Sequence, residues 1–184
     1  MYDILIENAS IIDGTASPPF EADLAIEGRN IADVGRLNRT DAALIIDAKG
    51  YAVAPGFIDM HSHADFSLPI LPTTDSLVHQ GITTAVVGQC GLSPAPLLEE
   101  SRARVISAIS GFFGDLAKSI PWSEWASLED YLNFLAHRGC SLNVIPLVGQ
   151  GTIRATVMGF GKGRADGRVS KWSVRATDRS DMWL

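Results

Sequence analysis

Two histidines and one cysteine carry the clearest chemistry in this sequence. His61 and His63 follow a short apolar run and are two residues apart, so on an extended segment both imidazoles point to the same face. Such a pair predicts a metal site in preference to a solvated turn. Cys90 follows the next apolar run, between Gly88 and Gly91. A cation held by the histidines would stabilise its thiolate, so we interpret Cys90 as a third ligand; the alternative is a small buried apolar residue.

Two aspartates flank the histidine pair. Asp65 either orients a ligand histidine or simply begins the next loop, and both interpretations stay open. Asp59 is expected to bond the backbone or to hold a histidine, and not to bind metal. We interpret Cys140 as structural, and His79 and His137 as surface or satisfied core residues on helices.

These residues need elements to position them. Alternating residues over 1–54 predict a small antiparallel β module, with a hairpin turn at 28–30. From residue 55 to 160 the pattern changes to strand, helix, strand, two helices, strand, which predicts a parallel α/β layout. The predicted strands are short and buried, and the predicted helices include one with a capping box: strands 57–60, 83–88 and 142–148; helices 74–80, 105–116 and 127–138. Active-site residues of such sheets gather at the carboxyl ends of strands, where both histidines and Cys90 fall.

Composition bounds the class of protein. The chain has 184 residues, 46% hydrophobic and 20% charged, with two cysteines and a net charge of −6. These values exclude a disordered, collagenous or disulfide-scaffold chain. They give no basic footprint for nucleic acid or for an anionic membrane. With no signal peptide and no apolar run of about 20 residues, we expect a soluble, cytoplasmic protein.

The last residues differ from the rest in charge. Residues 161–184 hold six Lys or Arg and three Asp or Glu, whereas residues 1–160 hold nine and eighteen. This basic tail has no clear apolar period. Our hypothesis is that it is out-of-frame sequence that does not belong to the preceding fold; the alternative is a solvated terminal tail.

The residues around the three candidate ligands also resemble a known family. The segment 55–63, Pro-Gly-Phe-Ile-Asp-Met-His-Ser-His, looks like the first-strand metal motif of the amidohydrolase superfamily. The segment 80–96, which contains Cys90, is similar to the N-acyl-D-amino-acid deacylase (D-aminoacylase) branch. Segments 125–132, 146–149 and 152–154 also look like that branch, so the resemblance covers residues 1 to 160. Gln150 departs from it, since a histidine is expected there.

The resemblance implies both a fold and an activity. The fold would be a (β/α)₈ TIM barrel joined to a small β-sandwich formed from both chain ends. The activity would be zinc-dependent hydrolysis of a small molecule, an N-acyl-D-amino acid, to a carboxylate and a free D-amino acid. By that pattern His61 and His63 would hold one zinc position, and Cys90 would ligate or bridge to the tighter one. Zinc would activate water for attack on the acyl carbon, and a barrel aspartate would be the general base.

Part of the expected machinery is missing from the sequence. The resemblance calls for two histidines and the general-base aspartate from later strands, so we assign no catalytic residue within this chain. Only three barrel strands are visible, whereas a closed barrel takes about 250 residues. We therefore expect an N-terminal portion, truncated or frameshifted, with negligible activity of its own.

Two other functions stay open. One is a cyclic amidase similar to hydantoinase or dihydroorotase, although Cys90 at the bridging position argues against it. The other is a non-catalytic metal-binding or partner-docking module. An unclosed sheet would expose strand edges and apolar surface, which favours oligomers or aggregation.

Overall fold

The computed structural model describes residues 1–160, apart from the side chain of Thr40. The chain forms two compact units, Met1–Pro55 and a second one that begins at Gly56. The predicted basic tail, residues 161–184, lies outside the described residues. Within the described part, no helix is both long and apolar enough to cross a membrane.

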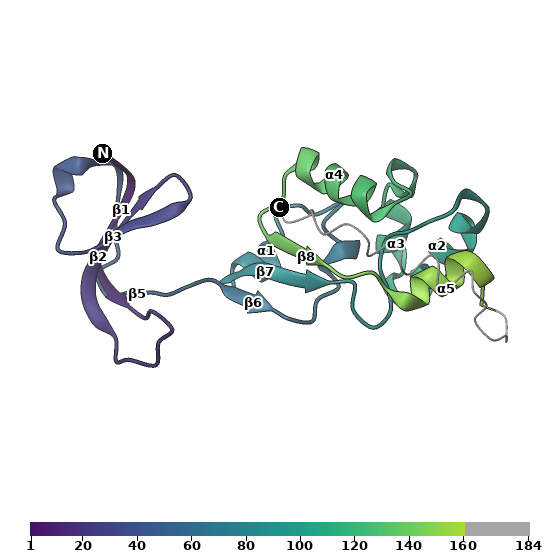
Figure 1. The fold of residues 1–184 in the computed structure, drawn as a ribbon, viewed down its shortest axis with the longest axis horizontal. Helices are drawn as coiled ribbons and strands as arrows, with labels where there is room; N and C mark the ends of the chain where they lie inside the picture. Colours follow the sequence, from purple (N-terminus) through teal and green to yellow (C-terminus); the bar gives the residue numbers. More distant parts are fainter. Residues whose placement is uncertain (161–184) are drawn as a thin grey trace. The chain divides into compact units, whose positions relative to one another are not determined.

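The first unit is one twisted sheet built around its first strand (Figure 1). The strands are β1 (Tyr2–Ile11), β2 (Phe20–Glu27), β3 (Asn30–Gly35), β4 (Ala42–Asp47) and β5 (Ala52–Val53). β1, β2 and β3 pair antiparallel, which confirms the predicted hairpin. The prediction of a wholly antiparallel module was wrong, because β4 and β5 both pair parallel to β1. After β3 the chain crosses to the far side of β1, and that crossover sets the parallel direction.

A β-bulge at Asn8 lets β1 serve two partners in turn. The register of β1 against β2 shifts between Ile6 and Ala9, and Asn8 has a φ of 58°. Its backbone N–H donates to Asp23 Oδ1 and its Nδ2 to Asp47 Oδ1, each at 2.9 Å. β4 pairs with β1 before the bulge and β5 pairs after it. The bulge thus marks the point where the neighbour of β1 changes.

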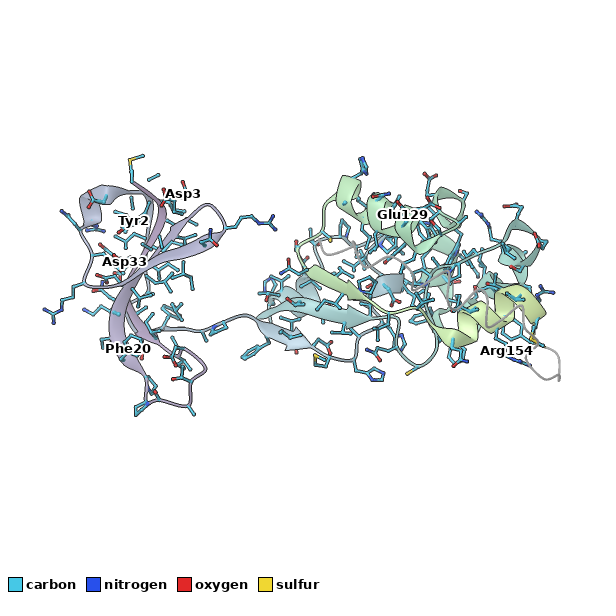
Figure 2. The ribbon with its side chains drawn as sticks, viewed as in Figure 1. Tyr2, Asp3, Phe20, Asp33, Glu129 and Arg154 are labelled. Carbon is cyan, nitrogen blue, oxygen red and sulfur yellow. The ribbon has the colours of Figure 1, made fainter. Side chains whose placement is uncertain are left out.

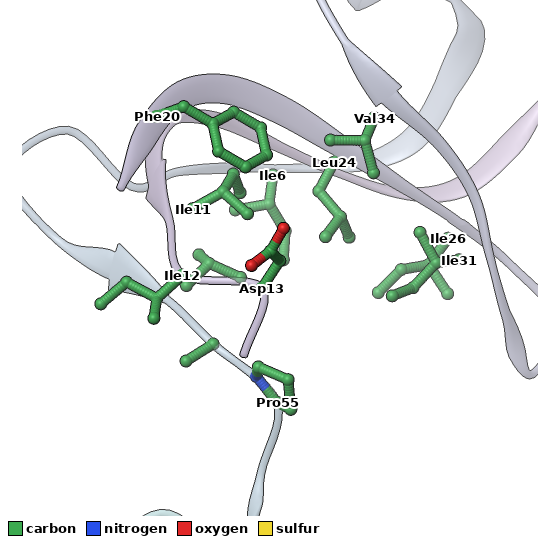
Figure 3. A pocket seen from close by; sticks show the side chains of 12 residues that line it. Ile6, Ile11, Ile12, Asp13, Phe20, Leu24, Ile26, Ile31, Val34 and Pro55 are labelled. Carbon is green, nitrogen blue, oxygen red and sulfur yellow. The ribbon is translucent and has the colours of Figure 1, made fainter. Parts of the chain in front are cut away.

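The core of this sheet is small and apolar. Leu5, Ala9 and Ala25 are completely buried. An apolar pocket of about 580 Å³ is lined by Ile6, Leu24 and their neighbours (Figure 3). At the surface the Tyr2 hydroxyl donates to Asp33 Oδ2 at 3.4 Å (Figure 2).

The second unit holds a three-stranded parallel sheet with helices packed beside it. Its strands run in the order β6 (Phe57–Asp59), β7 (Ile82–Val87) and β8 (Asn143–Pro146). This confirms the predicted parallel layout. The helices are α1 (Asp75–Val78), α2 (Glu99–Phe113), α3 (Asp115–Ser119), α4 (Leu128–Arg138) and α5 (Gln150–Met158). Short 3₁₀ turns lie at Ala64–Phe66 and Trp122–Glu124. Helices α2 and α5 lie side by side (Figure 1).

The largest fully buried side chains in the described part of the second unit are aromatic. Trp125 and Tyr131 are almost completely buried, with ring centroids 5.1 Å apart. The Trp125 indole N–H also donates to the Pro94 carbonyl at 2.9 Å. Tyr131 lies in the first turn of α4, and the predicted capping box fixes the beginning of that helix. The Ser127 side chain accepts from the Asp130 N–H, and the Asp130 side chain accepts in return from the Ser127 N–H.

One expectation about this sheet was wrong. The sequence predicted a buried first strand, yet Phe57 and Ile58 are 63% and 57% exposed. β6 is an edge strand, and the helices among the described residues leave these side chains uncovered. The apolar character of Phe57 and Ile58 therefore did not predict whether these side chains are buried.

Candidate metal centre

His61 and His63 lie in the loop that follows β6. The Asp59 carboxylate accepts the His61 backbone N–H at 3.1 Å, which confirms the predicted backbone role of Asp59. His61 is exposed, whereas His63 is half-buried against aromatic rings, with its ring centroid 6.0 Å from that of Phe113. The two imidazoles lie with centroids 5.9 Å apart. The loop therefore presents one solvent-facing and one packed imidazole.

Cys90 lies in a tight turn after β7. It has a φ of 55°, between Gly88 at 81° and Gly91 at 75°. A left-handed conformation costs a residue with a Cβ about 1–2 kcal/mol, so the surrounding contacts must hold Cys90 in place. A side chain at Gly88 would collide with the carbonyl of Leu147, which explains a glycine there. Cys90 is exposed, which argues against the alternative interpretation of this cysteine as a small buried apolar residue.

The structure brings these three side chains together. Cys90 Sγ lies 3.2 Å from His61 Nε2, and one ligand atom from each of His61, His63 and Cys90 lies within 4.8 Å of the others. A nitrogen and a thiolate on one zinc ion lie about 3.5 Å apart, given bond lengths of about 2.1 and 2.3 Å. His63 Nδ1 is buried with no hydrogen-bond partner among the described residues. The donor types and spacing therefore fit zinc.

The electrostatics of the loop favour metal binding. Burial, and after it the neighbouring His61, lowers the pKa of His63 below its usual value. The neutral imidazole is the form that ligates a metal, so His63 is prepared for that role at neutral pH.

Asp65 connects the two loops that carry the ligands. It is completely buried, and its Oδ2 accepts the Gly88 backbone N–H at 3.1 Å. The Tyr131 hydroxyl donates to the Asp65 carbonyl at 2.8 Å. Burial raises the pKa of Asp65 to about 7, and the Gly88 N–H partly opposes that rise. The sequence left two interpretations of Asp65 open, that it orients a ligand histidine or that it begins the next loop. Neither describes it fully, since its side chain accepts from Gly88 in the Cys90 loop and not from a histidine.

The other candidate side chains lie elsewhere. His79 ends α1, and His137 lies on α4 with its Nδ1 against the Asn133 carbonyl at 2.7 Å. Cys140 is half-buried and packs against the apolar core, as interpreted from the sequence. Gln150 is exposed at the start of α5.

Sequence reasoning missed three residues that shape the site. Gln89 Nε2 donates to the Met60 carbonyl at 3.0 Å and so ties the Cys90 turn to the histidine loop. Ser93, which follows the Cys90 turn, donates its backbone N–H to the Thr152 hydroxyl at the beginning of α5. In the sequence all three fall within the segments 80–96 and 152–154 that carry the family resemblance. Their contacts left no local pattern, because Ser93 and Thr152 are 59 residues apart.

A profile of the group described as "Amidohydrolase family" matches residues 44–170 of this chain. The chain belongs to the amidohydrolase family. The chain is 39% identical to an N-acyl-D-aspartate deacylase of Alcaligenes xylosoxydans xylosoxydans, over 95% of this chain and 33% of that protein. It is 36% identical to an N-acyl-D-glutamate deacylase of the same organism, over 85% and 30%. The chain thus spans about a third of the length of these relatives.

Solved structures agree with this assignment. The chain matches a crystal structure of D-aminoacylase with a TM-score of 0.80 and 32% identity, over 97% of this chain and 36% of that one. It matches an N-acyl-D-glutamate deacylase of Bordetella bronchiseptica, solved with zinc and a phosphonate inhibitor, with a TM-score of 0.77. These findings confirm the resemblance to the deacylase branch. They also confirm the fold class, the start of an α/β barrel preceded by a β module.

Proposed function

We propose that His61, His63 and Cys90 hold zinc, as part of an enzyme that hydrolyses the amide bond of N-acyl-D-amino acids. One observation carries this proposal: two imidazoles and a thiol converge at the carboxyl edge of a parallel sheet, with Cys90 Sγ 3.2 Å from His61 Nε2. The relatives named above, deacylases of N-acyl-D-aspartate and N-acyl-D-glutamate, support the substrate class. Zinc bound there would polarise an amide carbonyl and supply a nucleophilic water at neutral pH.

The chain's own residues hold and orient the donors. Asp59 fixes the backbone at His61, and Asp65 fixes the backbone at Gly88, two residues before Cys90. One oxygen of each carboxylate is thereby engaged in positioning, and Asp65 is out of contact with solvent. Neither is placed as a general base. We therefore expect the 184-residue chain alone to show negligible hydrolysis, and measurable turnover of an N-acetyl-D-amino acid would overturn that expectation.

The substrate class is tested by measuring the rates at which the longest natural form of the protein hydrolyses different substrates. Hydrolysis of N-acetyl-D-amino acids, with little of their L enantiomers or of hydantoin, is the expected result. Cys90→Ser is the matched variant, which replaces the thiolate by a hydroxyl of similar shape and is expected to lose activity with its metal. Faster turnover of hydantoin than of the linear D-substrate would replace the proposal by the cyclic-amidase alternative. The cytoplasmic location, and association through exposed strand edges, stay predictions.

A further inference from the structure

A pair of buried hydroxyls joins the Cys90 turn to the beginning of α5. The Ser93 backbone N–H donates to Thr152 Oγ1 at 2.9 Å, and the Thr152 hydroxyl donates to the Ser93 carbonyl at 3.0 Å. The Gly149 N–H donates to Ser93 Oγ at 3.0 Å. The Thr152 N–H donates to the Gly91 carbonyl at 3.0 Å. Ser93 and Thr152 are 0% and 2% exposed, so no water substitutes for either partner at the surface.

Close backbone contact accompanies these bonds. A Cβ at Gly149 would lie 2.5 Å from the Gly91 carbonyl oxygen, and one at Gly151 would lie 2.7 Å from the same atom. Both distances are too short for any side chain. The Cys90 turn and the start of α5 therefore meet with backbone on backbone, and the hydroxyl pair fixes the register of that contact.

The position of the Cys90 thiol depends on its backbone. Cys90 is exposed, and within residues 1–160 its Sγ makes its hydrogen-bond contact with His61 Nε2. On one side, Asp65 and Gln89 anchor the turn to the histidine loop. On the other side the anchor is Ser93 with Thr152. A residue with a Cβ stays in the left-handed conformation seen at Cys90 only where surrounding contacts hold it, and these two anchors are such contacts.

We propose that Ser93 and Thr152 are positioning residues, which hold the Cys90 thiolate at ligand distance from His61 and His63. This inference rests on the proposed zinc site and deepens it. Partners beyond the direct ligands orient metal sites in proteins, and their loss weakens metal affinity by about 10- to 100-fold. Here the hydroxyls of Ser93 and Thr152 bond backbone groups, and so act on the Cys90 thiol through the backbone of the Cys90 turn.

The test compares variants of the 184-residue chain loaded with Co²⁺, whose absorption reports thiolate ligation directly. Thr152→Val removes the hydroxyl and keeps the shape of the side chain. Thr152→Ser keeps the hydroxyl and removes only the methyl group. Thr156→Val is the matched control, because Thr156 is equally buried on the same helix and its hydroxyl donates to the Pro96 carbonyl at 3.0 Å, one turn further from the ligand loop.

We expect Thr152→Val to weaken Co²⁺ affinity by about tenfold or more and to reduce the thiolate-to-cobalt charge-transfer band. Thr152→Ser is expected to keep both the Co²⁺ affinity and the charge-transfer band of the wild type. Thr156→Val is expected to keep the affinity within about twofold, even where it lowers stability. Unchanged affinity and an unchanged charge-transfer band in Thr152→Val would overturn the inference.

Hydrogen exchange separates this inference from the proposed function. Wild-type chain that binds no Co²⁺ contradicts the proposed zinc site. The hydroxyl pair is then judged without metal, from the exchange rates of the amides in residues 88–92. We expect exchange about tenfold faster in Thr152→Val than in Thr156→Val. Equal rates in the two variants would overturn the positioning role.

Discussion

The two units of this chain differ in whether polar side chains are buried. Among the residues of the second unit that the structure describes, seven polar side chains are buried: Ser62, Asp65, Thr74, Ser93, Ser101, Thr152 and Thr156. In the first unit none of the described polar side chains is buried, and contacts such as Tyr2 with Asp33 lie at the surface. A buried polar group without a partner costs about 1–3 kcal/mol, so apolar side chains are the cheaper way to fill a core. Some of these buried polar groups bond the backbone of a loop, as Asp65 does at Gly88 and Thr152 at Ser93, and so help to hold that loop in one conformation.

Their location supports that interpretation. Asp65 lies two residues after His63, Ser93 lies three residues after Cys90, and Thr152 bonds Ser93 in the same Cys90 loop. The first unit supplies no donor to the ligand cluster found among the described residues. The contrast predicts that equivalent changes in the two units have different consequences.

The largest expected effect comes from the aromatic core. Trp125→Ala is expected to lower the free energy of unfolding by about 3–5 kcal/mol, because it removes a buried ring and leaves the Pro94 carbonyl without its donor. Chemical denaturation followed by far-UV circular dichroism measures the change. Trp125→Phe, which keeps an aromatic ring, is the control and is expected to cost less. A loss below about 1 kcal/mol for the alanine variant would contradict this packing.

A smaller effect compares one hydroxyl in each unit. Tyr131→Phe leaves the buried carbonyl of Asp65 without its donor and is expected to lower the free energy of unfolding by about 1–3 kcal/mol. Tyr51→Phe, at a side chain 73% exposed in the first unit, is expected to change it by less than about 0.5 kcal/mol. Urea titrations of both variants give the two values. Equal values would remove the distinction between the units.

The smallest effect depends on pH. Hydrogen bonds from the backbone and side chain of Ser127, and from the Ala126 N–H, lower the pKa of Asp130 below its usual value. A carboxyl with a lowered pKa stabilises the fold above its unfolded pKa, and the benefit is lost as the pH falls through the folded value. Asp130→Ala is thus expected to be less stable than wild type by less than about 1 kcal/mol at pH 7. The difference is expected to shrink below about pH 4 in denaturation curves. A difference that does not depend on pH would contradict this ionic role.

Local pattern was sufficient for much of the second unit. The strand ends that carry His61, His63 and Cys90, and the Ser127 capping box, were predicted because each depends on residues close in sequence. The grouping of the three candidate ligands followed from one rule, that parallel strands place their carboxyl ends along one edge.

Other features depend on contacts between distant residues. The parallel pairing of β4 with β1 is set by a crossover and not by the alternation of either strand. The helix α5 was not predicted, and its contact with the Cys90 turn joins Ser93 to Thr152, 59 residues apart. The exposure of Phe57 depends on its place at the sheet edge, which apolar character does not report.

The central claim is that His61, His63 and Cys90 together hold a metal ion. The most direct measurement is the stoichiometry and affinity of Zn²⁺ for the purified 184-residue chain, by equilibrium dialysis with metal analysis, beside Cys90→Ala and the matched control Cys140→Ala. We predict saturable binding to the wild type and to Cys140→Ala, and affinity weakened by about tenfold or more in Cys90→Ala. Equal affinity in the two cysteine variants, or no binding by the wild type, would contradict the account.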